Sequence, residues 1–189
     1  YRYHHGHWDG EEREFRGFGC VEQTDAETFA DYHSLSLFEE EIRANTLSVS
    51  AVQMKYFSPP VLTKTWFHLG PVRNNQGSWE TLDLSPEFFS VDWNVLQQDD
   101  LSAQAVLSLG HERQRRDALR AMRGKILRVE VFSPGNSAHG SRPFSVQEMS
   151  YGLQVIFSTD VPGAIPVIFP HMLAERNTVW ERGDDPVTR

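Results

Sequence analysis

The sequence is poor in several features that major protein classes need. Its 189 residues include one cysteine, Cys20, so no internal disulfide can form and the redox environment is left open. No apolar run approaches the roughly 20 residues of a membrane span, and no basic segment followed by an apolar one indicates a signal peptide. Lysine and arginine number 18 against 26 acidic residues, giving a formal net charge of −8. This balance argues against nucleic acid as a partner, because neutralising phosphates requires a basic face.

Catalytic signatures are scarce as well. The chain contains no Gly-x-x-x-x-Gly-Lys or Gly-x-Gly-x-x-Gly motif that would bind a phosphate. His68 and His171 have no Ser, Cys or Asp partner at a motif spacing, so both are interpreted as structural imidazoles. Cys20 follows Phe18-Gly19 in a predicted strand and is expected to be a small buried hydrophobe. We therefore predict no catalytic residue, no enzymatic activity and no cofactor.

Strand-forming residues dominate what is present. Short runs rich in Val, Ile, Phe, Tyr and Thr, separated by turn residues, predict strands over 1–5, 12–24, 47–56, 61–67, 127–131, 144–151, 154–157, 167–169 and 177–181. Such a pattern is typical of a meander of antiparallel hairpins that forms a curved sheet. The predicted class is mainly β, with 1–189 as a single β-rich domain.

One helical insert interrupts the strands, over 99–123. Leu101, Ala105 and Leu109 recur with helical spacing, and a second apolar stripe follows after Gly110, which is expected to break the run. Gly124 occupies the position at which a left-handed glycine ends a helix. A strand is predicted to start directly afterwards.

The segment near the start of the chain is the most informative. Two aromatic-rich runs meet at Asp9-Gly10, which predicts a β-hairpin, and Arg16 to Gly19 is expected to form a closing turn. Alternating glycines permit a sharp bend or bulge, charged residues can pair across the strands, and two phenylalanines are expected to be buried. The predicted structural motif comprises Asp9, Gly10, Arg13, Glu14, Phe15, Arg16, Gly17, Phe18 and Gly19.

The same segment offers a candidate metal site. In a straight strand His5, His7 and Asp9 would share one face, with His4 nearby, and two imidazoles with a carboxylate are a possible zinc or iron set. Gly6 lies between the histidines, however, and Asp9-Gly10 suits a turn better than a ligand. Surface or cross-strand histidines are the favoured interpretation.

Basic residues concentrate in one later segment. They are Arg113, Arg115, Arg116, Arg120, Arg123, Lys125 and Arg128. This segment could meet an acidic partner or an acidic part of the same protein, but a solvated helix face is the favoured interpretation.

Four patches, in order, resemble the middle region of the B component of insecticidal toxin complexes, which is related to SpvB and Rhs/YD-repeat proteins. They are Asp9-Gly10 through Glu14-Phe15-Arg16-Gly17-Phe18-Gly19 with Val21-Glu22-Gln23 and Asp25; Pro59-Pro60-Val61-Leu62-Thr63-Lys64-Thr65-Trp66-Phe67-His68; Ala118-Leu119-Arg120-Ala121-Met122-Arg123-Gly124-Lys125 running into Leu127-Arg128-Val129-Glu130-Val131; and Pro143-Phe144-Ser145-Val146. Residues 28–57 and 71–98 resemble the family least, so we expect variable insertions there.

This resemblance implies a non-catalytic role. It implies a fragment of a larger secreted toxin polypeptide, forming part of a β shell that encloses a toxic effector together with the C subunit. Other parts of the parent would dock on the pore-forming A subunit. Independently of the resemblance, the lack of a long apolar run predicts no direct membrane span, and the favoured interpretation of the histidines predicts no metal site.

Two alternatives stay open. An autonomous carbohydrate- or protein-binding β module would use exposed tryptophans as platforms, among Trp8, Trp66, Trp79 and Trp93. A small metal-dependent hydrolase would need His5, His7 and Asp9 to converge on one ion. Burial of the tryptophans tests the first alternative, and side-chain convergence tests the second.

Overall fold

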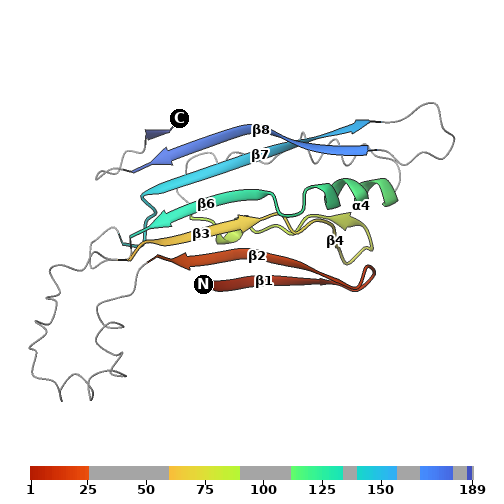
Figure 1. Cartoon of the computed structure of the whole chain (residues 1–189), viewed down its shortest axis with the longest axis horizontal. Helices are drawn as coiled ribbons and strands as arrows, with labels where there is room; N and C mark the ends of the chain where they lie inside the picture. The colour runs from red at the N-terminus through yellow and green to blue at the C-terminus, as the bar shows by residue number, and fades with distance from the viewer. Residues whose placement is uncertain (26–59, 90–111, 134–139, 157–166, 181–186, 189) are drawn as a thin grey trace, which may run out of the picture.

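A seven-stranded antiparallel sheet forms the body of the protein in the computed structural model, which describes residues 1–25, 60–89, 112–133, 140–156, 167–180 and 187–188. The strand order is β1-β2-β3-β6-β7-β8-β9 (Figure 1). The strands are β1 (Arg2–Asp9), β2 (Glu14–Thr24), β3 (Leu62–Phe67), β6 (Ile126–Phe132), β7 (Ser145–Ile156), β8 (Val167–Val179) and β9 (Val187–Thr188). Strand order follows chain order throughout this sheet, as in a meander.

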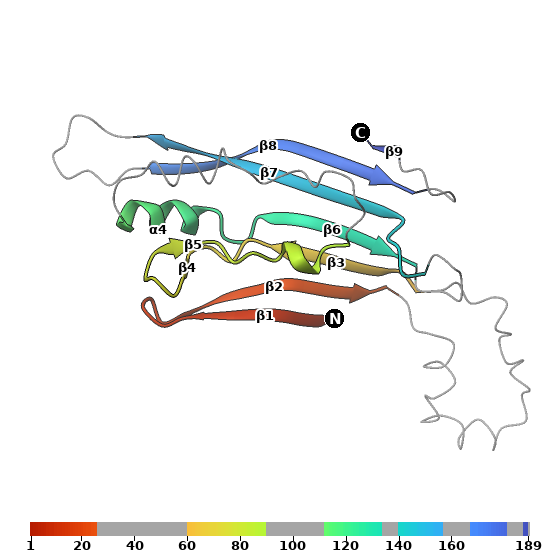
Figure 2. The ribbon, with the colours of Figure 1, turned by 180° about the vertical axis from the view of Figure 1, so that it is seen from behind.

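Short elements cover one face of the sheet. They are the two-stranded ribbon of β4 (Val72–Arg73) and β5 (Trp79–Glu80), the 3-10 turn η3 (Ser85–Glu87) and the helix α4 (Glu112–Ala121), seen from behind in Figure 2. One apolar cluster joins Cys20, Trp66, Leu84 and Leu127, with Phe88 packed against it. A second joins Trp79 to Ala118 and Leu119 of α4, with Leu153 and Ile168 from the β7–β8 hairpin. Burial of these side chains fixes the cover on the sheet.

A buried ion network lies on the same face, between β6, β7 and β8. Arg128 donates from Nε to Glu130 and from Nη1 to Glu148, both at 2.6 Å, and Glu148 also accepts from Arg176 Nε at 2.7 Å. These residues face each other because Arg128 pairs with Glu148 and Glu148 with Arg176 in the strand register. Arg128 also donates to the carbonyl of Phe89 at 3.1 Å, and the Phe89 N–H donates to Glu130 at 2.8 Å. Burial raises the pKa of Glu130 although Arg128 opposes the shift.

The predicted class is confirmed: the protein is mainly β and antiparallel, with a helix. Two details of the prediction are wrong. The runs predicted over 144–151 and 154–157 form one strand, β7, and those over 167–169 and 177–181 join in β8, which ends at Val179. Gly152 lies inside β7, opposite His171 on β8. A Cβ at position 152 would lie 3.0 Å from Nε2 of the His171 ring, so a glycine fits there. The ribbon β4–β5 and the short β9 were not predicted.

The helical insert is confirmed over Glu112–Ala121. Gly124 follows with φ +76, the left-handed conformation expected there. Residues 99–111, with the predicted break at Gly110, and the strand predicted over 47–56 lie outside the described residues. In the part of the chain that is described, no helix has the length and apolarity needed to cross a bilayer.

His68 joins the end of β3 to the start of β6. Its N–H donates to the carbonyl of Lys125 and its carbonyl accepts from the N–H of Gly124, both at 2.8 Å. Its ring Nδ1 accepts from the N–H of Gly70 at 3.3 Å, which requires that nitrogen to be unprotonated. Burial lowers the pKa of His68 to about 4.

This lowered pKa predicts an acid-sensitive contribution to stability. Below about pH 6.5 the unfolded chain binds a proton at His68, whereas the folded protein does so only near pH 4, so stability is complete above pH 6.5 and falls as the pH approaches 4. His68→Asn keeps an acceptor and removes the titration. Urea unfolding at pH 7 and pH 4 is expected to show about 2 kcal/mol less pH dependence in the variant than in the parent. Equal pH dependence would contradict this.

Candidate functional site

The predicted motif forms a bulged hairpin. β1 and β2 pair antiparallel, with His7 opposite Gly17 and Trp8 opposite Phe15, so Arg16 is an extra residue on β2. Gly17 adopts φ +105, a conformation in which an L side chain is strained. The expected bulge is confirmed, but the expected closing turn at Arg16 to Gly19 is wrong, because these residues lie inside β2.

Asp9 organises the turn between the two strands. Its Oδ1 accepts from the N–H groups of Glu11, at 2.9 Å, and Glu12, at 3.3 Å. These bonds hold the loop that Asp9-Gly10 was predicted to form. Arg13, with φ +54, completes the reversal.

The other carboxylate oxygen of Asp9 binds Arg16, and this pair is buried. The Arg16 side chain is 1% exposed and that of Asp9 6%. Arg16 also donates to the carbonyl of Pro71, which ties the bulge to the segment before β4. Burial, with Arg116, Arg120 and Arg123 nearby, lowers the pKa of Arg16 to about 10, so it stays charged at neutral pH.

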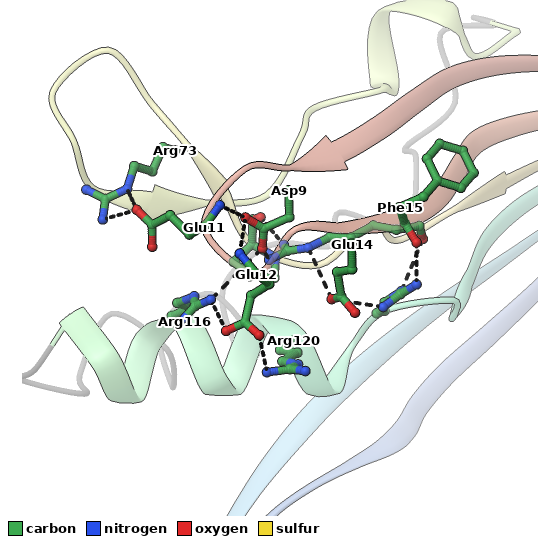
Figure 3. A network of polar contacts seen from close by, with 11 residues as sticks. Asp9, Glu11, Glu12, Glu14, Phe15, Arg73, Arg116 and Arg120 are labelled. Carbon is green, nitrogen blue, oxygen red and sulfur yellow. Dashed lines mark hydrogen bonds and ion pairs between the residues drawn. The ribbon is translucent and has the colours of Figure 1, made fainter.

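Arginines of helix α4 and of the turn after it form ion pairs and hydrogen bonds with the β1–β2 hairpin (Figure 3). Arg116 and Arg120 both pair with Glu12, the latter at 3.5 Å. Arg123 pairs with Glu14 at 3.1 Å and donates to the carbonyls of Arg16, at 3.1 Å, and Phe15, at 3.0 Å. The bulge exposes these carbonyls to an external donor, so the arginine replaces strand pairing there.

The ribbon β4–β5 holds the hairpin from the other side. Arg73 pairs with Glu11 at 2.6 Å. The guanidinium groups of Arg73 and Arg116 lie 4.5 Å and 5.2 Å from the ring centroid of Trp79, which is 8% exposed. We call this assembly the arginine clamp, defined by Arg16, Arg73, Arg116, Arg120 and Arg123 on the acids Asp9, Glu11, Glu12 and Glu14.

The clamp corrects the interpretation of the basic segment. A solvated helix face was favoured, but Arg116, Arg120 and Arg123 meet acids of the same chain and Arg128 is 5% exposed. The burial expected for Phe15 is also wrong, since it is 46% exposed. Nothing in the sequence signals that the partners of α4 lie about 100 residues earlier.

The candidate metal ligands have separate partners. His5 Nε2 lies 2.7 Å from Glu87 Oε1, and Asp9 is held by Arg16. Burial, with a contribution from Arg16, lowers the pKa of His7. Among the residues that the structure describes, no three His, Cys, Asp or Glu side chains gather as a metal site would require.

The tryptophans do not form a row of platforms. Trp66 and Trp79 are buried, at 1% and 8% exposure, whereas Trp8 is 61% exposed. Trp93 lies outside the described residues. An autonomous module built on several exposed tryptophans is therefore not supported by the described ones.

Two further singled-out residues have structural surroundings. Cys20 is 3% exposed, as expected, and burial with nearby Glu22 and Glu87 raises its pKa to about 11. A thiol with such a pKa is a poor nucleophile at neutral pH. The ring of His171 packs over Gly152.

These features define a mainly β domain whose charged groups serve its own packing. Residues 1–37 match the family described as the insecticide toxin TcdB middle/N-terminal region. No curated protein matches the chain. The predicted resemblance to the B component of insecticidal toxin complexes is confirmed.

Solved structures match over almost the entire chain. A crystal structure of TcdB2-TccC3 shares 27% identity with a TM-score of 0.65, and one of TcdB2-TccC3 without its hypervariable C-terminal region shares 28% with a TM-score of 0.66. The Photorhabdus luminescens Tc holotoxin pore matches at 28% with a TM-score of 0.62. Each match covers 99% of this chain and 8% of the matched one, so the present chain corresponds to a small part of those proteins.

The bulge makes a specific prediction about Gly17. Gly17→Ala adds a Cβ at φ +105, where space is free but the backbone is strained, and we expect a loss of about 1–2 kcal/mol in unfolding free energy. Gly10→Ala, in the same hairpin and also without close neighbours, is the control and should change stability by less than about 0.5 kcal/mol. Urea denaturation compares the two, and equal losses would contradict the role of the bulge.

The buried pair predicts a larger effect. Asp9→Ala leaves Arg16 charged and buried without its carboxylate, which should cost about 3–5 kcal/mol in urea unfolding. Asp9→Leu with Arg16→Met removes both charges and should cost less than the single change. Glu11→Ala breaks the exposed pair with Arg73 and should cost at most about 1 kcal/mol. A double variant as unstable as Asp9→Ala would show that packing, not the unpaired charge, dominates.

Proposed function

We propose that this chain is a non-catalytic structural part of a toxin-complex B subunit, contributing to the Rhs-like β shell that encloses a toxic effector and helps to deliver it. The observation that carries the proposal is the match over 99% of the chain to structures in which TcdB2 is combined with TccC3. The parent protein is proposed to be secreted as part of a bacterial toxin complex. Residues 28–57 and 71–98 are proposed as variable insertions in an otherwise single domain.

The geometry supports a wall rather than a reaction centre. A wall segment must resist deformation while one side faces a cargo and the other solvent. Here the most elaborate polar groups, the arginine clamp and the Arg128 network, bind the covering segments to the sheet. Their hydrogen bonds go to backbone and side chains of the same chain, which stiffens the domain.

The proposed partners are the C subunit directly and, through other parts of the parent protein, the A subunit. Neither nucleic acid nor a membrane is proposed as a partner. The net charge of −8 fits the first exclusion, because a phosphate backbone would be repelled.

The proposal is tested by mixing the 189-residue chain with a C-subunit shell fragment and measuring mass by size-exclusion chromatography with light scattering. A complex that survives about 0.5 M salt is expected, because screening removes association that depends only on surface charge. An unrelated β domain of similar net charge is the control. A monomeric chain that never co-elutes would contradict direct contact with the C subunit.

A further inference from the structure

The strand β1 lies at the border of the sheet. It is the first strand in the order β1-β2-β3-β6-β7-β8-β9, and Figures 1 and 2 show its outer side without a neighbouring strand among the described residues. Its eight residues contain no proline, so one row of backbone donors and acceptors is available for strand addition. Edges of this kind are where extended partners bind.

One side of β1 carries exposed aromatic residues. Tyr1, Tyr3 and Trp8 are 74%, 55% and 61% exposed, and Phe15, opposite Trp8 on β2, is 46% exposed. Ring centroids are 6.3 Å apart for Tyr1 and Tyr3 and 4.8 Å apart for Tyr3 and Phe18. This row, called the aromatic strip, is an apolar surface that isolated domains rarely leave open.

The other side of β1 carries Arg2, His4 and His5. His4 and His5 contact Glu22 and Glu87, at 3.6 Å and 2.7 Å, and both acids lie on the covered face. His5 has φ +56, and this left-handed residue interrupts the regular alternation of the strand. Arg2, opposite Glu22 and exposed, makes no ion pair with any residue that the structure describes.

A row of alternating charge reaches β1 from the interior of the sheet. In the strand register Arg2 pairs with Glu22, Glu22 with Lys64 and Lys64 with Glu130. Lys64 binds Glu22 at 2.9 Å. Burial alone would raise the pKa of Glu22, but Lys64 and His4 outweigh it and the pKa is lowered. The row ends in a cation at the open edge, so the next member of the alternation is an acid.

We propose that the free edge of β1 docks a partner β-strand in which acidic residues alternate with aromatic or aliphatic ones. The acids face Arg2 and His4, and the apolar residues cover Tyr3 and Trp8. This inference rests on the proposed function, and it specifies the side-chain chemistry of the strand that would lie next to β1 in the proposed β shell. A second copy of the chain is a poorer occupant, because the one acid of β1, Asp9, is already engaged by Arg16, so β1 of another copy has no free acid to place opposite Arg2.

The opposite border of the sheet, formed by β9 and by the part of β8 that β9 does not pair with, fits such a strand less well. β8 contains Pro170 opposite Leu153, and a proline within a ladder must turn its nitrogen away from the paired strand. The outer edge of β8 therefore lacks a donor at that point, a feature of edges that resist strand addition. Phe169, 56% exposed beside this proline, provides a matched control site.

The test uses the 189-residue chain and two eight-residue peptides with capped ends. One alternates Glu with Phe and Val, and the other has Lys in place of each Glu. Calorimetry is expected to show at least about tenfold tighter binding of the Glu peptide. Amide hydrogen exchange should slow in β1 and not in β8. A third peptide, the Glu sequence with alternate backbone amides methylated, should not bind, because strand addition needs those donors.

Variants identify the side chains responsible. Arg2→Glu with His4→Glu changes exposed positions and should reverse the peptide preference, while Tyr3→Ser should weaken binding of the Glu peptide by about fivefold. Phe169→Ser should leave both affinities unchanged. Thermal unfolding followed by circular dichroism checks that each variant folds.

Several outcomes would overturn the inference. They are equal affinity for the Glu and Lys peptides, protection at β8, binding of the methylated peptide, or a concentration-dependent dimer protected at β1. If none of the peptides binds but the chain still co-elutes with the C-subunit fragment, this inference fails and the proposed function stands. If the Glu peptide binds and co-elution fails, this inference stands and the proposed function fails.

Discussion

The buried pair of Asp9 and Arg16 is the interaction on which the first hairpin depends. Arg16 is the extra residue of a bulge, and its side chain enters the space beneath the sheet at 1% exposure. A charge at that depth is tolerated only with a partner in good geometry and with its remaining donors satisfied. Asp9 provides the partner and Pro71 an acceptor, so the turn, the bulge and the covering segment are fixed together, while Arg16 Nε has no hydrogen-bond partner and lies 3.8 Å from a Glu14 oxygen.

In the middle of the sheet, the Arg128 network likewise pairs buried charges of opposite sign. Glu130 is 1% exposed and lies on a strand whose other inward residues are apolar or paired. It is held by Arg128 from its own strand and by the N–H of Phe89 from the cover. Removing either charge would leave the other buried, which explains why these strands carry both signs at adjacent register positions.

The sequence predicted the positions of strands and of the helix better than it predicted which residues contact each other. The strands around Val21, Thr65 and Val129 were visible because β-branched and aromatic residues cluster there between turn signals. The sequence predicted two strands in place of each of β7 and β8. Gly152 and Pro170 lie inside these strands, Gly152 opposite His171 and Pro170 opposite Leu153, and the ladder accommodates both. Local propensity contains no information on that pairing.

The candidate site shows the same limit more clearly. Asp9-Gly10 and Gly17 were identifiable, since turn chemistry and positive φ are local requirements. The partners of Arg116 and Arg123 were not, because they lie 104 and 109 residues away and depend on where α4 packs. Likewise, the histidines of β1 were visible as a cluster, but their partners were not: His5 contacts Glu87 and Asp9 is bound by Arg16, both through tertiary packing that the local sequence does not contain.

A common principle connects both ion networks to the irregular parts of the chain. Backbone groups in strands are satisfied by the ladder, whereas those in covering loops and at bulges need other partners. Arginine suits this task because its donors form a fixed fork that reaches a carboxylate and a carbonyl at once. Arg16 does so with Asp9 and Pro71, Arg123 with Glu14 and Phe15, and Arg128 with Glu148 and Phe89. The chain is acidic and has 18 lysines and arginines. The arginines at these junctions bind parts of the same chain to one another and do not form a surface for an anionic ligand.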